Sequence, residues 1–114
     1  MDEKKELPPP TAEDLAVQEF MEALVRGVLE HRAQLDAEIA RYAKNWDISR
    51  MAAVDRNVLR LAIYEMMFRE DIPPVVSINE AVDIAKKFST DESGRFVNGI
   101  LDVVRTNILR PSRG

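Results

Sequence analysis

Residues 54–68 read VDRNVLRLAIYEMMF, and the apolar residues in this run recur with the period of an α-helix. The main apolar stripe, spaced three or four residues apart, consists of Val54, Val58, Leu61, Tyr64 and Phe68. Further apolar residues widen the stripe beyond one face, namely Leu59, Ile63, Met66 and Met67. So wide an apolar surface predicts a helix that is buried on several sides.

The residues around this helix predict where it and the following helices begin and end. Ser49 is a candidate N-cap, and Pro73 with the proline after it must break the helix, since proline cannot donate a backbone hydrogen bond. Residues 77–80 have the spacing of a capping box, which predicts that a short helix opens there. Thr90, followed by two acidic residues, is expected to cap a last helix over residues 91–109.

Another helix is predicted upstream. Thr11 and Asp14 have the spacing of a capping box, so this helix should begin at about residue 12. Its apolar stripe continues to Trp46, either as one long helix or as two helices with a bend within residues 27–32. No strand pattern or internal repeat competes with this interpretation, so the predicted fold class is all-α, a bundle of about four helices.

The start of the chain differs in composition from the rest. Residues 1–10 are mostly charged or proline, and we expect a disordered acidic, proline-containing tail there, followed by one helical domain over residues 11–114. There is no apolar h-region near the start and no run of about eighteen apolar residues anywhere. We therefore expect a cytoplasmic protein without membrane contact.

The chemical repertoire of the chain is narrow. Its 114 residues include no cysteine and a single histidine, His31. Disulfides, zinc–thiolate sites and a cysteine nucleophile are thereby excluded, and one histidine cannot form a multi-histidine metal site. We expect no catalytic residues, no metal site and no cofactor, so the protein is predicted not to be an enzyme.

Charge is distributed unevenly along the chain, whose overall net charge is −4. Residues 1–30 hold eight acidic and three basic residues, whereas residues 95–114 hold four arginines and one aspartate. An acidic start therefore stands opposite a basic end, and the basic end is compatible with an anionic partner.

Residues 93–99 are unusual for the interior of a helix. Gly94 and Gly99 each weaken a helix by about 1 kcal/mol relative to alanine, and Asn98 lies between them. Ser93, Arg95 and Asn98 could donate hydrogen bonds to an anion such as a phosphate, and an exposed Phe96 ring could stack on a base. Tight packing against another helix explains the glycines equally well, and both interpretations stay open.

Four blocks of the chain, residues 55–65, 71–74, 78–88 and 93–102, closely resemble the C-terminal half of the NusB family of bacterial transcription antitermination factors. Their order and spacing agree, and the resemblance extends from about residue 19 to residue 109. It implies an all-helical protein that binds boxA-type RNA together with NusE, a ribosomal protein, within the antitermination complex on RNA polymerase.

The resemblance also implies roles for individual residues. Asp55 matches an acidic position near the NusE surface of the family. The residues that match positions near the bound RNA are Arg60, Glu92, Ser93, Arg95, Phe96 and Asn98.

This sequence departs from the family pattern before Thr11. The family begins with an arginine-rich helix and a second helix, whereas an acidic, proline-containing segment precedes Thr11 here. Because phosphate contacts dominate RNA affinity, we expect weakened RNA binding. We also expect the apolar surfaces of residues 15–46 and 54–68 to be partly uncovered and the chain to form a homodimer.

Two other functions are compatible with the resemblance. A NusB-like domain also serves as the RNA-docking unit of a ribosomal RNA cytosine methyltransferase, so the chain could be a fragment of such an enzyme. It could also be a protein-binding remnant that has lost RNA binding.

Overall fold

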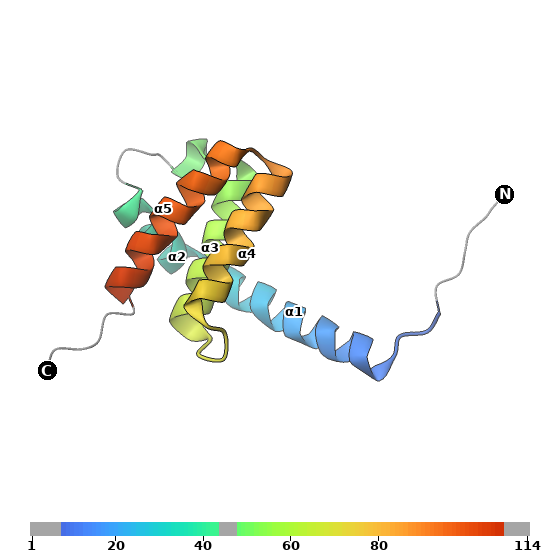
Figure 1. Cartoon of the computed structure of the whole chain (residues 1–114). Helices are drawn as coiled ribbons and strands as arrows, with labels where there is room; N and C mark the ends of the chain where they lie inside the picture. The colour runs from blue at the N-terminus through green and yellow to red at the C-terminus, as the bar shows by residue number, and fades with distance from the viewer. Residues whose placement is uncertain (1–7, 44–47, 109–114) are drawn as a thin grey trace, which may run out of the picture.

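The computed structural model describes residues 8–43 and 48–108, and Figure 1 shows that they form a helical bundle. The elements are α1 (Ala12–Glu30), α2 (Arg32–Tyr42), a short 3-10 helix η1 (Ile48–Arg50), α3 (Ala53–Phe68), α4 (Pro74–Phe88) and α5 (Asp91–Ile108). Within the described ranges there is no strand, so the predicted all-α class is confirmed. The described residues form five α-helices instead of about four, because the long N-terminal helix is divided.

The division between α1 and α2 falls at His31, inside the range predicted for a bend. The predicted capping box at the start of α1 is confirmed: the Asp14 amide donates to Thr11 Oγ1 and the Thr11 amide donates to Asp14 Oδ2, both at 3.0 Å. The tail predicted over residues 1–10 falls largely on residues 1–7, which lie outside the described residues.

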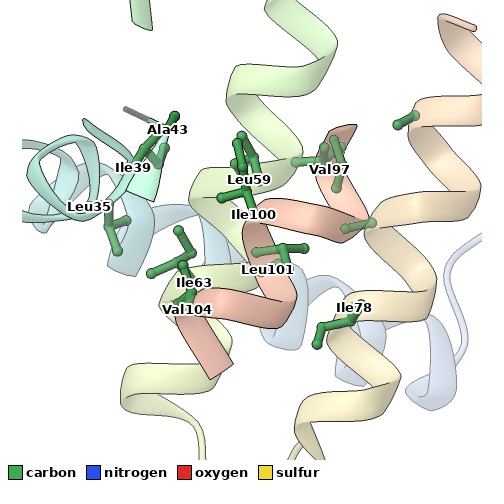
Figure 2. Packing of buried hydrophobic residues seen from close by; sticks show 14 of the residues in the cluster. Leu35, Ile39, Ala43, Leu59, Ile63, Ile78, Val97, Ile100, Leu101 and Val104 are labelled. Carbon is green, nitrogen blue, oxygen red and sulfur yellow. The ribbon is translucent and has the colours of Figure 1, made fainter. Parts of the chain in front are cut away.

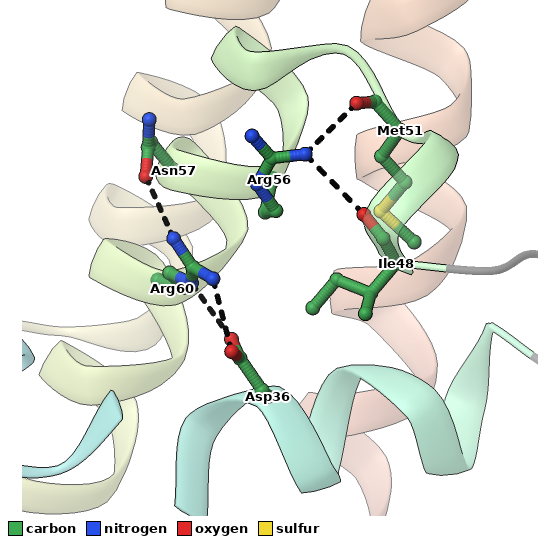
Figure 3. A network of polar contacts seen from close by, with 6 residues as sticks. All are labelled: Asp36, Ile48, Met51, Arg56, Asn57 and Arg60. Atoms are coloured by element: carbon green, nitrogen blue, oxygen red, sulfur yellow. Dashed lines mark hydrogen bonds and ion pairs between the residues drawn. The ribbon is translucent and has the colours of Figure 1, made fainter. Parts of the chain in front are cut away.

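The predicted N-cap of α3 was wrong. Ser49 lies in the 3-10 helix, and α3 begins four residues later, at Ala53. Arg56 helps to hold this geometry, because its Nη1 atom donates to the carbonyl oxygens of Met51 at 3.0 Å and Ile48 at 3.3 Å (Figure 3). The chain therefore makes a separate turn before α3 instead of entering the helix directly.

The capping box predicted at residues 77–80 was also wrong, because α4 begins earlier, at Pro74. Proline suits the first position of a helix because its fixed φ angle is helical. An N–H group at this position would form no intrahelical hydrogen bond, so its absence from proline costs nothing there. Ser77 is consequently an interior helix residue and only 2% exposed. The cap predicted for α5 is confirmed, since the Ser93 amide donates to Thr90 Oγ1 at 2.9 Å.

Helix α3 lies in the middle of the bundle and contacts α1, α2, α4 and α5. Figure 2 shows Leu59 and Ile63 of α3 beside the buried residues of α5, with α2 on one side and α4 on the other. The fully buried side chains of this core include Leu35, Ile39, Leu59, Ile63, Ala85, Val97, Leu101 and Val104. The wide apolar surface of α3 is thus mostly covered, as predicted, and the part that stays uncovered includes Phe68, which is 39% exposed.

Helix α1 attaches to this core through its C-terminal half. Gly27 allows α1 to approach α3 closely, since a Cβ atom at this position would overlap the Tyr64 ring. The half-buried His31 ring packs against Tyr64 and Phe68, with ring centroids 5.8 and 4.3 Å away. The N-terminal half of α1 projects from the bundle (Figure 1).

The projecting helix α1 carries an apolar ridge, formed by Val17, Met21, Val25 and Leu29 at spacings of four residues. Each of these side chains is between 52% and 61% exposed. Residues four apart lie on one face of a helix, so the ridge is continuous. The exposed apolar surface expected from the sequence is therefore present on α1.

Candidate nucleic-acid interface

The N-terminal ends of α3 and α5 meet through a buried carboxylate. Asp55, in the first turn of α3, is only 6% exposed, and its Oδ2 accepts a hydrogen bond of 3.1 Å from Ser93 Oγ of α5. Its other oxygen, Oδ1, has no hydrogen-bond partner among the residues that the structure describes. A buried carboxylate oxygen without a donor is costly, which makes this position a candidate for binding an external donor.

Hydroxyl groups around Ser93 fix the start of α5. Ser89 Oγ and Ser93 Oγ lie 2.9 Å apart, and Thr90 Oγ1 donates to Ser93 Oγ at 3.2 Å. Together with the bond to Asp55, these contacts hold Ser93 in one position. The first turn of α5 is therefore anchored to α3 through side chains as well as by packing.

A cavity of about 300 Å³ opens beside this network. Its lining brings together Asp55 and three residues assigned to RNA by the resemblance, namely Glu92, Ser93 and Phe96. Arg50 and Thr90 also line it. Thr90 was noticed in the sequence only as a helix cap, and no sequence pattern pointed to Arg50, which reaches the cavity from η1.

Two further candidate residues lie on the same helix but outside this cavity. Arg95 and Asn98 are exposed on α5, within one turn of Phe96, and neither forms an ion pair or side-chain hydrogen bond with another described residue. Their donors are therefore free to contact a ligand that lies over the start of α5. The Asn98 side chain is exposed and is not enclosed by the packing of α5.

Arg60 is placed differently from the other candidates. Its guanidinium group forms a two-pronged ion pair with Asp36 of α2, with Nε–Oδ1 and Nη2–Oδ2 distances of 2.7 and 2.9 Å (Figure 3). Nη1 also donates to Asn57 Oδ1 at 3.1 Å. Arg60 does not line the cavity, and its contacts join α2 to α3.

Removing either partner of this ion pair should destabilise the protein. Because both side chains are less than one-third exposed, we expect Arg60→Ala and Asp36→Ala each to lower the free energy of unfolding by about 1–3 kcal/mol. Urea titrations followed by circular dichroism measure this change, and the double variant should lose less than the sum of the two. Losses below about 0.5 kcal/mol would show that the pair is an ordinary surface contact.

Neither a metal site nor a membrane span was found in the parts of the chain that the structure describes. Residues 8–43 and 48–108 contain no group of three His, Cys, Asp or Glu side chains suited to holding a metal ion. None of the helices in these ranges combines the length and the apolar composition needed to cross a bilayer.

The sequence profile of the NusB family matches residues 2–106. The chain belongs to the NusB family. Among its relatives, the transcription antitermination protein NusB of Geobacter sulfurreducens is 53% identical over 95 residues, which cover 83% of this chain and 67% of the relative. The protein of the same name from Chloroherpeton thalassium is 42% identical over 102 residues, or 90% of this chain and 48% of the relative.

Two solved structures agree with the fold described above. T. maritima NusB superposes with a TM-score of 0.73 at 49% identity, covering 75% of this chain and 61% of that one. A chain in the crystal structure of a plectonemic RNA supercoil superposes with a TM-score of 0.77 at 32% identity, covering 82% of this chain and 68% of the other. This NusB-family chain spans about half to two-thirds of the length of the relatives named above.

Proposed function

We propose that this protein is a transcription antitermination factor that binds boxA-type RNA together with NusE, within the antitermination complex on RNA polymerase, and that it catalyses no reaction. The names of its relatives support this assignment. So does the similarity to a chain from an RNA-containing crystal structure. The observation that carries the proposal is the cavity that unites Asp55, Glu92, Ser93 and Phe96.

The chemistry of the cavity suits a single-stranded RNA. The half-buried Phe96 ring offers a surface on which a base can stack. The exposed carboxylate of Glu92 can accept hydrogen bonds from base amino groups, and Arg50 and Arg95 can contact phosphates. In this proposal the start of α5 is the RNA-binding element.

Asp55 is proposed to support partner binding indirectly. Because only 6% of Asp55 is exposed, NusE can touch little of it directly. Its hydrogen bond to Ser93 instead fixes the first turn of α5, from which the exposed residues of that helix are presented. A change at Asp55 should therefore disturb RNA and NusE binding together.

The dimer expected from the sequence is proposed to form through the apolar ridge of α1. An antiparallel two-fold arrangement would place the N-terminal end of one ridge against the C-terminal end of the other, and isologous pairing of this kind is common in soluble oligomers. Helix α1 also carries five acidic residues and one arginine, so two copies repel each other electrostatically. Dimerisation should consequently strengthen as salt screens this repulsion.

The salt dependence of RNA binding tests the proposed interface. Few basic residues are available for phosphate contacts. The logarithm of the affinity for a boxA-type RNA should therefore fall with the logarithm of the salt concentration, and its slope should correspond to about one to three phosphate contacts. Arg95→Ala should weaken binding and reduce the slope by about one, because it removes one phosphate contact.

Arg105→Ala is the matched control, since it removes an exposed arginine from the last turn of the same helix. In filter-binding titrations, the slope of log affinity against log salt for Arg105→Ala should equal that of the unmodified chain. Equal effects of the two substitutions, or a slope unchanged by Arg95→Ala, would place the RNA surface elsewhere.

A further inference from the structure

A second cavity lies between α1, α3 and α4, and it shares no lining residue with the cavity at the start of α5. Its volume is about 340 Å³, which falls in the range of about 300–1,000 Å³ that is usual for small-molecule sites. The walls of this α1–α3–α4 cavity are mostly apolar and include Phe20, Leu61, Ile72, Val76 and Ile84.

One polar side chain is buried at this cavity. Ser77 lines it and is only 2% exposed, and Ser77 Oγ has no hydrogen-bond partner among the residues that the structure describes. Ala81 and Ala85 follow at spacings of four residues on the same face of α4 and are also buried. Alanine would therefore fit at position 77 without the cost of an unsatisfied hydroxyl group. The hydroxyl group is a candidate partner for an external hydrogen-bond donor.

Two carboxylates lie near Ser77. Helices α3 and α4 run side by side and are joined by residues 69–73, so Glu65, close to the end of α3, is level with Ser77, close to the start of α4 (Figure 1). Glu80 follows Ser77 by three residues and shares its side of α4. Both glutamates line the cavity, and neither side chain forms a hydrogen bond or an ion pair with another described residue.

The charge at this end of the cavity is negative, because none of the described lining residues is a lysine or an arginine. Arg69, one turn after Glu65, donates two hydrogen bonds to Asp71 instead, at 2.9 and 2.8 Å. Its guanidinium carbon lies 5.0 Å from the centroid of the Phe20 ring. Arg69 thus lies beside the Phe20 wall, and its hydrogen bonds go to Asp71.

We propose that the α1–α3–α4 cavity binds a small organic ammonium ion with an apolar body, such as an arylalkylamine. A primary ammonium group has three N–H donors, and Glu65, Ser77 and Glu80 each supply an acceptor. Hydrogen bonds between charged groups are the stronger kind. The apolar body would lie against Leu61 and Ile84, each one turn further from residues 69–73 than the nearest glutamate.

Size and charge favour this ligand over other occupants. The cavity has room for a whole small molecule, whereas one lysine side chain of another protein would fill only part of it. A phosphate or another anion would be repelled by the two carboxylates. A neutral apolar molecule would leave Ser77 Oγ unsatisfied.

A titration of the full chain with 2-phenylethylammonium, followed by nuclear magnetic resonance, tests the proposal. We expect saturable shifts of the backbone amides around residues 61–65 and 77–84, with a dissociation constant of about 1 mM, as is reasonable for a ligand of this size. Three related probes should bind at least tenfold more weakly. They are 3-phenylpropionate, which reverses the charge, 2-phenylethanol, which removes it, and methylammonium, which lacks the apolar body.

Substitutions of the three acceptors should weaken binding to different extents. Glu65→Gln should lower the affinity at least fivefold, because this carboxylate is half-buried, and the exposed Glu80→Gln should lower it about twofold. Ser77→Ala should lower it about threefold while raising the melting temperature by about 2–4 °C, since an unsatisfied buried hydroxyl group is removed. Asp83→Asn is the matched control, because Asp83 is exposed on α4 outside the cavity lining, and its affinity should be unchanged.

Several results would overturn the proposal. Equal binding of 2-phenylethylammonium and 3-phenylpropionate, or shifts that do not saturate, would show that the cavity does not select an ammonium ion. Unchanged affinity in both Glu65→Gln and Ser77→Ala would place the bound probe elsewhere. A weaker dimer of Glu65→Gln in sedimentation equilibrium would assign the cavity to a side chain of a second copy of the chain. RNA affinity should stay within twofold in all four variants, and a larger loss would assign this cavity to RNA as well.

Discussion

Replacing Met21 and Val25 together by aspartate is expected to dissociate the proposed dimer into monomers. Both side chains are 56% exposed at the centre of the α1 ridge, so the isolated fold should tolerate the change. In the dimer the same positions would bring four new carboxylates into an apolar contact between helices that are already acidic. Burying charges without partners is far more costly than exposing them, and the dissociation constant should rise at least 100-fold.

Sedimentation equilibrium measures this change against a monomer mass of 13.0 kDa. The unmodified chain should dimerise more tightly at higher salt, and its melting temperature should rise with concentration, because association stabilises by mass action. Val75→Asp is a matched control, since Val75 is 52% exposed but lies in the first turn of α4. A monodisperse monomer with a concentration-independent melt would show that the five helices close their own core.

Leu101→Ala is expected to lower the free energy of unfolding by about 2–5 kcal/mol. Leu101 is fully buried, and Figure 2 shows it beside Ile63 of α3 and between Ile100 and Val104 in the middle of the core. Alanine would leave a cavity there as well as removing apolar burial. Because a whole domain is stabilised by only about 5–15 kcal/mol, the variant should be close to unfolding at 37 °C.

Urea unfolding at one fixed protein concentration measures the effect of Leu101→Ala separately from dimerisation. Val103→Ala, which shortens an exposed apolar side chain two residues further along α5, should cost less than about 0.5 kcal/mol. RNA binding by Leu101→Ala should recover when the folded state is restored by an osmolyte, since the substituted residue lies inside the core. Similar losses for both variants would mean that α5 is not packed as described.

Local sequence signals predicted several helix ends correctly and two incorrectly. The starts of α1 and α5 were predictable because Thr11 and Thr90 each cap their own first turn through contacts three residues away. Ser49 and Ser77 had equally suitable neighbours, but neither became a cap. At Ser77 a competing local signal, proline at the first helical position, started the helix earlier.

The candidate site was predictable in part. The segment around Phe96 could be singled out because glycine and asparagine, which occur there at positions 94, 98 and 99, are unfavourable inside a helix. The participation of Asp55 in the same cavity depends on a contact with Ser93, 38 residues away, and no local pattern encodes such a distance. The same holds for Arg60, whose partner Asp36 lies 24 residues upstream.

The amino-acid sequence by itself determined the helical class, the family and the approximate extent of each helix, because the period of apolar residues and the capping contacts act over a few residues. Only the tertiary structure decided which charged side chains became structural, and that packing against Lys86 of α4 encloses Gly94 but not Gly99. It also decided that the apolar ridge of α1 stays exposed, whereas most of the apolar surface of α3 is buried. These outcomes depend on which helices pack together. Packing brings together residues that are far apart in the chain, and the local sequence around either residue does not show which partner it will contact.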